Sequence, residues 1–385
     1  MNVLEKLGSW CNYLVLILVN IAYCPGIIVT PIYYNVVIPA IMALVVVSLL
    51  TNVRREWPSM LKMYAYYGIY VLVVGSIEYL VEDVFYLGVT GNIFLTITIF
   101  LLGYTASRRD RGYLLNCFKS FVFAAMFMGV YSVFSKIGGF MIVEEYVFNV
   151  KNSSGVLLST AMILCLFLVL STEKAFGRWF WVASYILLAI CLLTFRCRTA
   201  IVVAFVCTIF VLFRTEGLKS VVFRPSTIFM VVIFVVVCSM ILPENYGYDA
   251  IFAGRDATDA NSVTSGRINQ VSHAWRVFNE NQLLGCCGSG MGKSMLVDNY
   301  VMAVLANYGL FGALLVFPAY LIAIVFCFWE LLKTRVEDSY GLLILFGLLI
   351  TSISEGSYPF GPGTPVMCGY FLLGWWYKST KIPID

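Results

Sequence analysis

The chain has 385 residues, of which 61% are hydrophobic and 12% are charged, and its formal net charge is +4. A soluble domain usually carries about a quarter charged residues, so this composition excludes an ordinary water-soluble protein. The apolar runs are long enough to cross a bilayer, and they are continuous rather than alternating, which disfavours a β-barrel. The sequence therefore predicts an all-α polytopic membrane protein in which residues 1–385 form a single membrane domain.

About 12 apolar runs of spanning length follow one another along the chain. The first begins close to Met1, and a second follows at once without a small-residue cleavage signal, so we interpret it as a retained span rather than a signal peptide. The spans are predicted near residues 10–30, 33–50, 63–81, 85–104, 114–135, 153–171, 179–196, 198–213, 226–242, 297–328, 339–355 and 364–377.

Basic residues cluster in the connections that follow the even-numbered spans and at the C-terminus. The positive-inside rule then places both termini in the cytoplasm, and it explains the net positive charge without nucleic-acid binding. The clusters are Arg54, Arg55 and Lys62; Arg108, Arg109 and Arg111; Lys174 and Arg178; Arg214, Lys219 and Arg224; Lys333 and Arg335; and Lys378 and Lys381.

One long polar segment, residues 243–296, separates the ninth and tenth predicted spans on the outer side. Loops of this length are usually functional or disordered. Because the stretch from Ile268 to Phe278 has a helix-like pattern with aromatic residues, we expect the segment to form an external cap over the outer mouth of the bundle.

Two arginines, Arg196 and Arg198, lie at the predicted outer junction of the seventh and eighth spans. A charge near membrane depth usually has a partner or a task, and guanidinium groups pair well with diphosphate. The alternative is that both arginines only mark the interface. Since the outer side is otherwise poor in basic residues, we favour a functional role for Arg198 and leave both interpretations open for Arg196.

The cap contains two further candidates. Arg267 begins the helix-like stretch, and its alternative role is a loop ion pair with Asp256 or Asp259. His273 is the single histidine of the chain and a candidate proton acceptor, because its ordinary pKa is near 6.5. A surface position on a helix is the more common role for such a histidine.

The glycine-rich residues 285–294 do not form a P-loop. That motif needs a glycine five places before Gly292, where this chain has Cys287. We expect the glycines to let the backbone turn sharply near the membrane or approach a ligand. The adjacent Cys286 and Cys287 lack the spacing of metal ligands, and no metal is predicted.

Two acidic residues lie at predicted outer span ends. Asp298 begins the tenth span together with Asn299 and Tyr300. It is either a helix cap or a carboxylate that orients or deprotonates an acceptor hydroxyl, and both roles are compatible. Glu355 ends the eleventh span, where it is either interfacial or lines the cavity.

The motifs and their order along the chain resemble those of the O-antigen ligase/polymerase family of bacterial membrane proteins, over roughly residues 150–360. The family often has Ser-Arg-Thr where this chain has Cys-Arg-Thr. The matching pieces are Lys151-Asn152-Ser153, Cys197-Arg198-Thr199, Ser265-Gly266-Arg267, Leu283-Leu284-Gly285, Gly288-Ser289-Gly290, Asp298-Asn299-Tyr300, Gly309 with Gly312, and Glu355.

The resemblance implies a glycosyltransferase that uses a glycan linked to undecaprenyl diphosphate as donor. An acceptor hydroxyl attacks the anomeric carbon, and the lipid diphosphate leaves. Arg198 and Arg267 match the family's arginines and would stabilise the leaving group, with Arg196 assisting and Asp298 as the candidate base. The remaining candidates for substrate contacts are Asn299, Tyr300, His273 and Glu355. The lipid diphosphate bond supplies the energy, so no cofactor or nucleotide is implied.

Family ligases commonly have His-Asn where this chain has Asp298-Asn299, which favours the polymerase branch. The expected partners are a lipid-linked donor and acceptor, membrane lipid and, as a further candidate, a chain-length regulator. The implied location is the bacterial cytoplasmic membrane, with the active site on the external face. A ligase is the nearest alternative. A flippase or other transporter is the rival from another class, although transporters tend to show inverted repeats and broken helices near mid-membrane.

Overall fold

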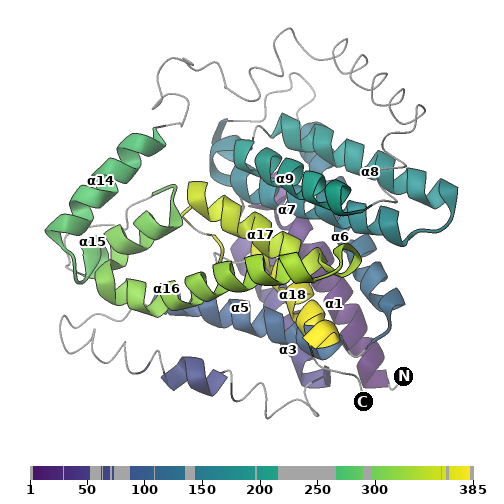
Figure 1. The fold of residues 1–385 in the computed structure, drawn as a ribbon, viewed down its shortest axis with the longest axis horizontal. Helices are drawn as coiled ribbons and strands as arrows, with labels where there is room; N and C mark the ends of the chain where they lie inside the picture. Colours follow the sequence, from purple (N-terminus) through teal and green to yellow (C-terminus); the bar gives the residue numbers. More distant parts are fainter. Residues whose placement is uncertain are drawn as a thin grey trace, which may run out of the picture.

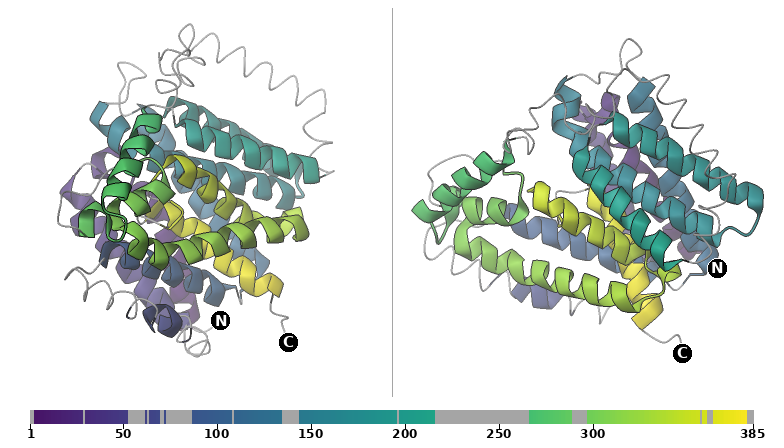
Figure 2. Two further views of the ribbon diagram at one scale, coloured as in Figure 1. Left: turned by 60° about the vertical axis from the view of Figure 1, so that its left-hand side comes forward. Right: turned by 45° about the horizontal axis from the view of Figure 1, so that its top comes forward.

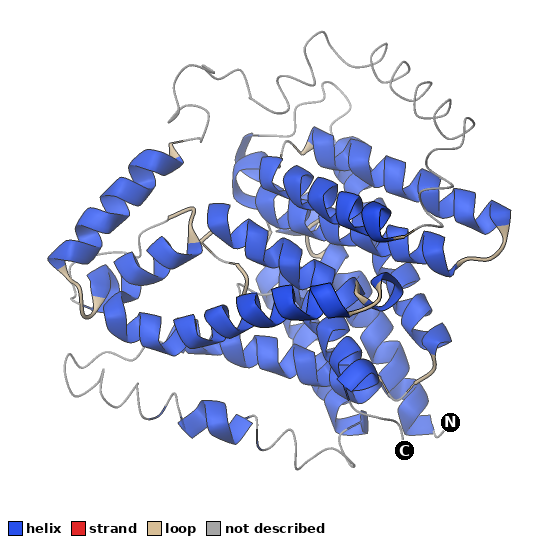
Figure 3. Ribbon diagram, in the orientation of Figure 1, coloured by secondary structure: helices blue, strands red, loops and turns tan. Residues whose placement is uncertain are grey.

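A computed structural model describes residues 3–28, 30–52, 62, 64–69, 72, 87–107, 109–134, 144–195, 197–215, 266–288, 297–356, 358–360 and 364–381. These residues fold into helices joined by turns and contain no strand, as Figures 1 and 3 show. The predicted all-α class is therefore confirmed for the part of the chain that the structure describes.

The helices follow the predicted spans closely where both can be compared. The ninth predicted span, most of the third and most of the 243–296 segment lie outside the described residues. The elements are α1 (Val3–Ile21), α2 (Pro25–Ile28), η1 (Tyr33–Val37), α3 (Ile38–Asn52), α5 (Leu87–Ala106), α6 (Arg111–Phe134), α7 (Glu144–Ser171), α8 (Ala175–Thr194), α9 (Arg198–Arg214), α14 (Arg267–Glu280), α15 (Gly285–Gly288), α16 (Tyr300–Lys333), η3 (Val336–Asp338), α17 (Tyr340–Ser354) and α18 (Thr364–Lys381).

The first span differs most from its prediction. The apolar run continues to residue 30, but α1 ends at Ile21, and the short α2 follows after a turn. Pro25 lies at the first position of α2, where a proline is tolerated because its missing N–H would be unpaired there anyway. The proline therefore divides one apolar run into two helices.

Five helices are long and apolar enough to cross a membrane among the residues that were described: Tyr33–Thr51, Arg111–Phe134, Lys151–Ser171, Ala175–Thr194 and Val316–Lys333. Four shorter apolar helices accompany them: Lys6–Ile21, Ile93–Ala106, Tyr300–Leu314 and Tyr340–Ser354. The chain thus has the helical composition of a multi-pass membrane protein.

Helix α7 lies at the centre of the bundle. Its apolar window is 89% buried, compared with 28% for that of α8. It contacts α6, α8, α9, α17 and α18, which surround it in Figures 1 and 2. A helix that is apolar all round is stable only when it is buried or in lipid. The peripheral helices instead leave large apolar side chains such as Phe176, Leu321 and Val325 exposed, as a lipid-facing surface requires.

Helices α5 and α18 pack backbone against backbone. A Cβ atom on Gly103 would overlap the carbonyl oxygen of Phe371, and one on Gly374 would overlap that of Phe100. Small residues allow this approach, which gains dispersion contacts that do not depend on water. The contact fixes the last helix of the chain against the N-terminal half.

Helix α16 is broken near its N-terminal end. Gly309 has a φ of 60°, outside the helical region. The N–H groups of Leu310 and Phe311 donate to the carbonyl oxygens of Gln282, at 2.9 Å, and Leu283, at 3.1 Å. The loop before α15 therefore replaces the hydrogen bonds that the break removes. The sequence predicted an uninterrupted span here, because hydropathy does not register a single glycine.

Candidate functional site

One guanidinium group connects two carboxylates from distant parts of the chain. Arg267 is the first residue of α14. Its Nε lies 3.4 Å from Oδ2 of Asp298, just before α16, and its Nη2 lies 3.1 Å from Oε1 of Glu355, just after α17. The side chain of Asp298 is 38% exposed and that of Glu355 only 12%. The three candidates thus form one charged cluster, which we call the Arg267 cluster.

Glu355 is the most enclosed carboxylate of the cluster. Burial and the nearby charge of Asp298 raise its pKa to about 7. Arg267, a hydrogen bond with Asn152 and the charge of Lys151 act in the opposite direction but do not offset the burial. A carboxyl group with a pKa of about 7 is part-protonated near neutral pH, whereas an ordinary glutamate is fully deprotonated there.

Helix α9 begins beside the cluster. The Sγ atom of Cys197 lies 3.7 Å from Oδ1 of Asn152 on α7, and the hydroxyls of Thr199 and Ser354 lie 2.6 Å apart. Arg198 stands between these two contacts and is partly buried. The chain on either side of Arg198 is therefore attached to the same helix ends, α7 and α17, that hold Glu355.

Cys197 itself is no nucleophile. Burial raises the pKa of its thiol to about 11, with the charge of Glu355 acting in the same direction. A reactive cysteine needs a depressed pKa, because the thiolate is the attacking species. A Cβ atom on Gly155 would lie only 2.6 Å from the Cys197 sulfur, so Cys197 fills a tight gap between α7 and α9.

Asn299 and Asp298 divide the two roles that the sequence left open at the start of α16. The Asn299 side-chain oxygen accepts a hydrogen bond from the Met302 N–H at 3.0 Å, and its Nδ2 donates to the Ile353 carbonyl at 3.0 Å. Asn299 therefore caps α16 and joins it to α17. The Asp298 carboxylate is left to pair with Arg267, while the Asp298 N–H donates to Oε1 of Gln270 at 3.4 Å.

Tyr300 belongs to the core rather than to the Arg267 cluster. Its side chain is 7% exposed, and its ring packs against those of Tyr320 and Phe360, with centroids 5.3 and 6.1 Å apart. The structure places Tyr300 in the core, and its predicted contact with substrate stays a prediction. Its large ring, one residue after the cap, holds the N-terminal end of α16 in the bundle.

His273 points away from the cluster. It is exposed, and its Nδ1 lies 2.9 Å from Nη2 of Arg276 on the same helix. Helical periodicity places Arg267, Gln270 and Ala274 on the inner face of α14, so His273 falls on another face. Arg196 lies outside the described residues, as do Asp256 and Asp259, the other partners considered for Arg267.

Several contributors were not predicted as site residues. Lys151 and Asn152 were noted only as part of a motif, and Gln270 was not noted. Gln270 could have been found, because it is three residues after Arg267 and so shares its helix face. The Tyr358 hydroxyl, which donates to Ser153 Oγ at 3.5 Å, had no recognisable signal.

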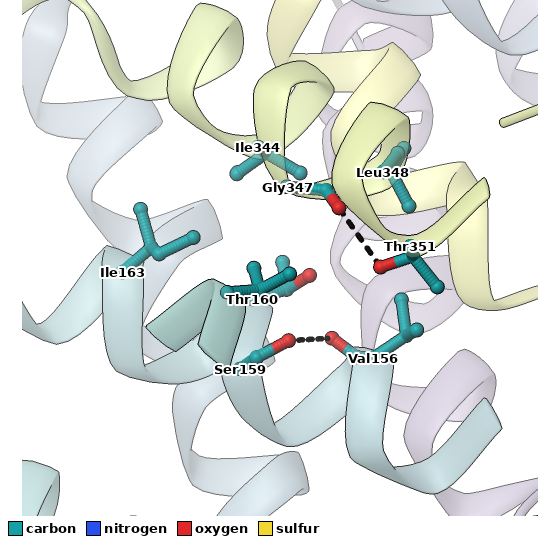
Figure 4. Close-up of a pocket in the computed structure, with 9 residues that line it drawn as sticks. Val156, Ser159, Thr160, Ile163, Ile344, Gly347, Leu348 and Thr351 are labelled. Atoms are coloured by element: carbon teal, nitrogen blue, oxygen red, sulfur yellow. Dashed lines mark hydrogen bonds between the residues drawn. The ribbon is translucent and has the colours of Figure 1, made fainter. Parts of the chain in front are cut away.

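A small cavity lies deeper in the bundle, between α7, α9 and α17 (Figure 4). The Ser159 hydroxyl donates to the Val156 carbonyl at 3.0 Å, and that of Thr351 to the Gly347 carbonyl at 2.8 Å. These hydroxyls are satisfied by their own helices, so the cavity needs no ligand to explain its lining. The charged groups gather one turn further out, at the Arg267 cluster.

A comparison with known protein families and with curated proteins found no match to this chain.

Proposed function

We propose that the protein is a polymerase of oligosaccharide repeat units linked to undecaprenyl diphosphate, as used for O-antigen, capsule or exopolysaccharide. One observation carries the proposal. The motifs that resemble the O-antigen ligase/polymerase family are far apart in sequence, yet Asp298 and Glu355 both pair with the guanidinium group of Arg267, and Asn152 forms a hydrogen bond with Glu355. Four of the motifs thus contribute side chains to one charged site.

The cluster offers the charges that the reaction needs. The leaving diphosphate develops negative charge as the anomeric bond breaks, and prepositioned cations stabilise that charge. Arg267 uses Nε and Nη2 for its ion pairs, and a guanidinium has five N–H donors in a rigid fork. Arg198 begins α9 beside the same helix ends. In the proposal, these two arginines bind the diphosphate, and Arg196 assists.

The carboxylates serve the acceptor. Asp298 is the more exposed of the two, so an incoming sugar hydroxyl can approach it. In this mechanism Asn299 and Tyr300 position the start of α16 instead of contacting substrate, since one caps the helix and the other packs in the core. His273 has no part in it, because the side chain lies on an outward face of α14.

The proposed topology has about 12 spans, both termini in the cytoplasm and the Arg267 cluster on the external face of the bacterial cytoplasmic membrane. It is supported by the basic residues after even-numbered spans. The described ends of α1 and α18 also lie at one side of the bundle, away from α14, in Figures 1 and 2. The partners proposed with this topology are a lipid-linked donor and acceptor, membrane lipid and a chain-length regulator.

A transporter of lipid-linked glycan is the second candidate, and the break in α16 at Gly309 is the observation that favours it. Transporters use broken helices whose unpaired backbone groups bind cargo. In this protein the N–H groups after the break are instead taken by the Gln282 and Leu283 carbonyls. We therefore prefer the polymerase to the transporter. A ligase of the same family is the nearest enzymatic alternative.

The test uses purified protein in lipid, with synthetic undecaprenyl-diphosphate repeat units and without nucleotide. Wild type is expected to give a ladder of polymer lengths. Arg198→Ala and Arg267→Ala each remove a diphosphate contact and should lower the rate by roughly 10²-fold or more, the usual effect of losing one such donor. Arg276→Ala is the matched control, because that arginine is exposed on the outward face of the same helix.

Two results would contradict the proposal. If wild type gives no ladder but carries labelled lipid-linked glycan across a sealed bilayer, the protein is a transporter. If Arg276→Ala lowers the rate as much as Arg267→Ala, general loss of positive charge is responsible and the Arg267 cluster is not the diphosphate site.

A further inference from the structure

We propose that Glu355, rather than Asp298, takes the proton from the attacking hydroxyl of the acceptor sugar. This inference rests on the proposed function and assigns the base within it. The sequence made Asp298 a candidate that orients or deprotonates the acceptor hydroxyl, made Glu355 a candidate substrate contact, and left the identity of the base open.

The position of Glu355 supports this role. It stands where four elements meet, and each presents a polar or titratable group to it. Its side chain is 12% exposed, compared with 38% for Asp298, so it is shielded from water but not sealed. The groups facing it are Lys151 and Asn152 from α7, Cys197 before α9, Arg267 from α14, Asp298 before α16 and Tyr358 from the turn after α17.

The electrostatic surroundings suit a base. A carboxylate with an ordinary pKa near 4 is a weaker general base at neutral pH than one whose pKa lies near 7. Burial, aided by the charge of Asp298, raises the pKa of Glu355 to about 7. The best general base has a pKa near the working pH, because it must be deprotonated at the start yet bind the proton well in the transition state.

The proton transfer balances with the bond changes. The acceptor oxygen forms a bond to the anomeric carbon while the bond from that carbon to the diphosphate oxygen breaks. The electron pair of the broken bond stays on the diphosphate. The acceptor proton moves to the Glu355 carboxylate and is later released to water, so each cycle restores the deprotonated base.

The proton transfer to Glu355 also increases the positive charge that Arg267 presents to the diphosphate as the transition state forms. Before reaction, the Arg267 charge is shared between two carboxylates. When Glu355 becomes neutral, that sharing falls, and more of the guanidinium charge is available to the diphosphate. An interaction that grows in the transition state lowers the barrier, whereas one of constant strength does not.

The experiment compares wild type, Glu355→Gln and Asp298→Asn in the ladder assay across pH 5 to 9. For wild type, activity should rise with pH through about 7, because the deprotonated form of Glu355 is the active one. Glu355→Gln should lose about 10²-fold or more in rate, and the rising limb of its pH–rate profile should disappear. Asp298→Asn should lose rate but keep a rising limb, shifted to lower pH because the charge of Asp298 helps to raise the pKa of Glu355.

Rescue by added azide distinguishes loss of a general base from loss of a residue that only supports the structure. Azide attacks the anomeric carbon without losing a proton, so it needs no base. Added azide should restore donor consumption by Glu355→Gln, with a glycosyl azide as the product. A non-reactive lipid-diphosphate analogue should bind Glu355→Gln at least as tightly as wild type, because the neutral side chain leaves more of the Arg267 charge to the diphosphate.

The outcomes can be told apart. If wild type makes no polymer, the proposed function fails. If wild type makes polymer and Glu355→Gln keeps the rate or the rising limb, or is not rescued by azide, the assignment of Glu355 fails and the function stands. Should Glu355→Gln not fold, Glu355→Asp decides, because a carboxylate shorter by one methylene must lower the rate. An unchanged rate would overturn the assignment.

Discussion

Gly309 shows how much depends on a single residue without a side chain. Its φ of 60° is a conformation that other residues adopt only with strain, and a Cβ atom there would overlap the backbone of Leu283. Gly285 has the reciprocal position, with a φ of 65° and a Cβ that would lie 2.5 Å from the Tyr308 nitrogen. The two glycines let the loop before α15 lie directly on the broken helix.

Gly309→Ala should therefore destabilise the protein through both strain and overlap. Gly266→Ala is the matched control, because Gly266 also has a positive φ, 79°, but nothing lies within 4 Å of its Cβ position. Gly266, with a ψ of 3°, is left-handed, and an alanine there should cost roughly 1–2 kcal/mol. Gly309, with a ψ of −159°, lies in a region that is almost restricted to glycine, and an alanine there should cost roughly 1–3 kcal/mol in backbone strain. The overlap should add about 1–3 kcal/mol at Gly309 alone. Thermal unfolding in one detergent measures the difference, and equal effects would show that the contact with Leu283 yields easily.

At the scale of elements, the Arg267 cluster depends on where helices begin and end. Arg267 begins α14, Arg198 begins α9, Asn299 caps α16 and Glu355 follows α17. Helix ends carry unpaired backbone groups and short connections, so they can bring polar side chains together without placing charge in the middle of the bilayer. The bundle then acts as a scaffold that determines which ends coincide.

Asn299 tests this arrangement, since it contributes one hydrogen bond to α16 and another to α17. Asn299→Ala removes both and should lower the free energy of unfolding by about 1–2 kcal/mol. Asn299→Ser keeps an oxygen for the Met302 N–H and should lose only part of that stability. Thermal unfolding measures both variants, and a Ser variant no better than Ala would mean that the cap contributes little.

At the scale of the whole molecule, the proposal requires the cap helix α14 and the connection after α16 to lie on opposite sides of the membrane. The positive-inside pattern predicts Arg335 in the cytoplasm and residues 243–296 outside. Of the ten cysteines whose side chains the structure describes, nine are buried and Cys286 is partly exposed, so labelling of wild type is measured as the background.

A membrane-impermeant maleimide applied to intact cells should therefore label Arg276→Cys at once. It should label Arg335→Cys only after the membrane is opened. Both positions are exposed, so each new thiol is accessible to the reagent on its own side. Labelling of both variants from outside would contradict the even-numbered arrangement and, with it, the external active site.

Hydropathy was enough to predict most helices in the described part of the chain, because a bilayer leaves an apolar segment little choice but a helix with internal hydrogen bonds. Breaks were predicted less well. The end of α1 before Pro25 and the kink at Gly309 each depend on one residue within a long apolar run, and an average over about 20 residues hides them.

Within the candidate site, the sequence by itself determined which polar residues stand at span ends, since Arg198, Asp298 and Glu355 all lie where an apolar run begins or ends. It also placed Arg267 at the start of the helix-like stretch in the polar segment. Only the tertiary structure decided that Arg267 pairs with Asp298 and Glu355, that Tyr300 is core and that His273 faces outward. Hydropathy and helical period are local properties that neighbouring residues specify. Which helix ends meet, and how deeply each charge is then buried, follows from packing between segments that are far apart in the chain.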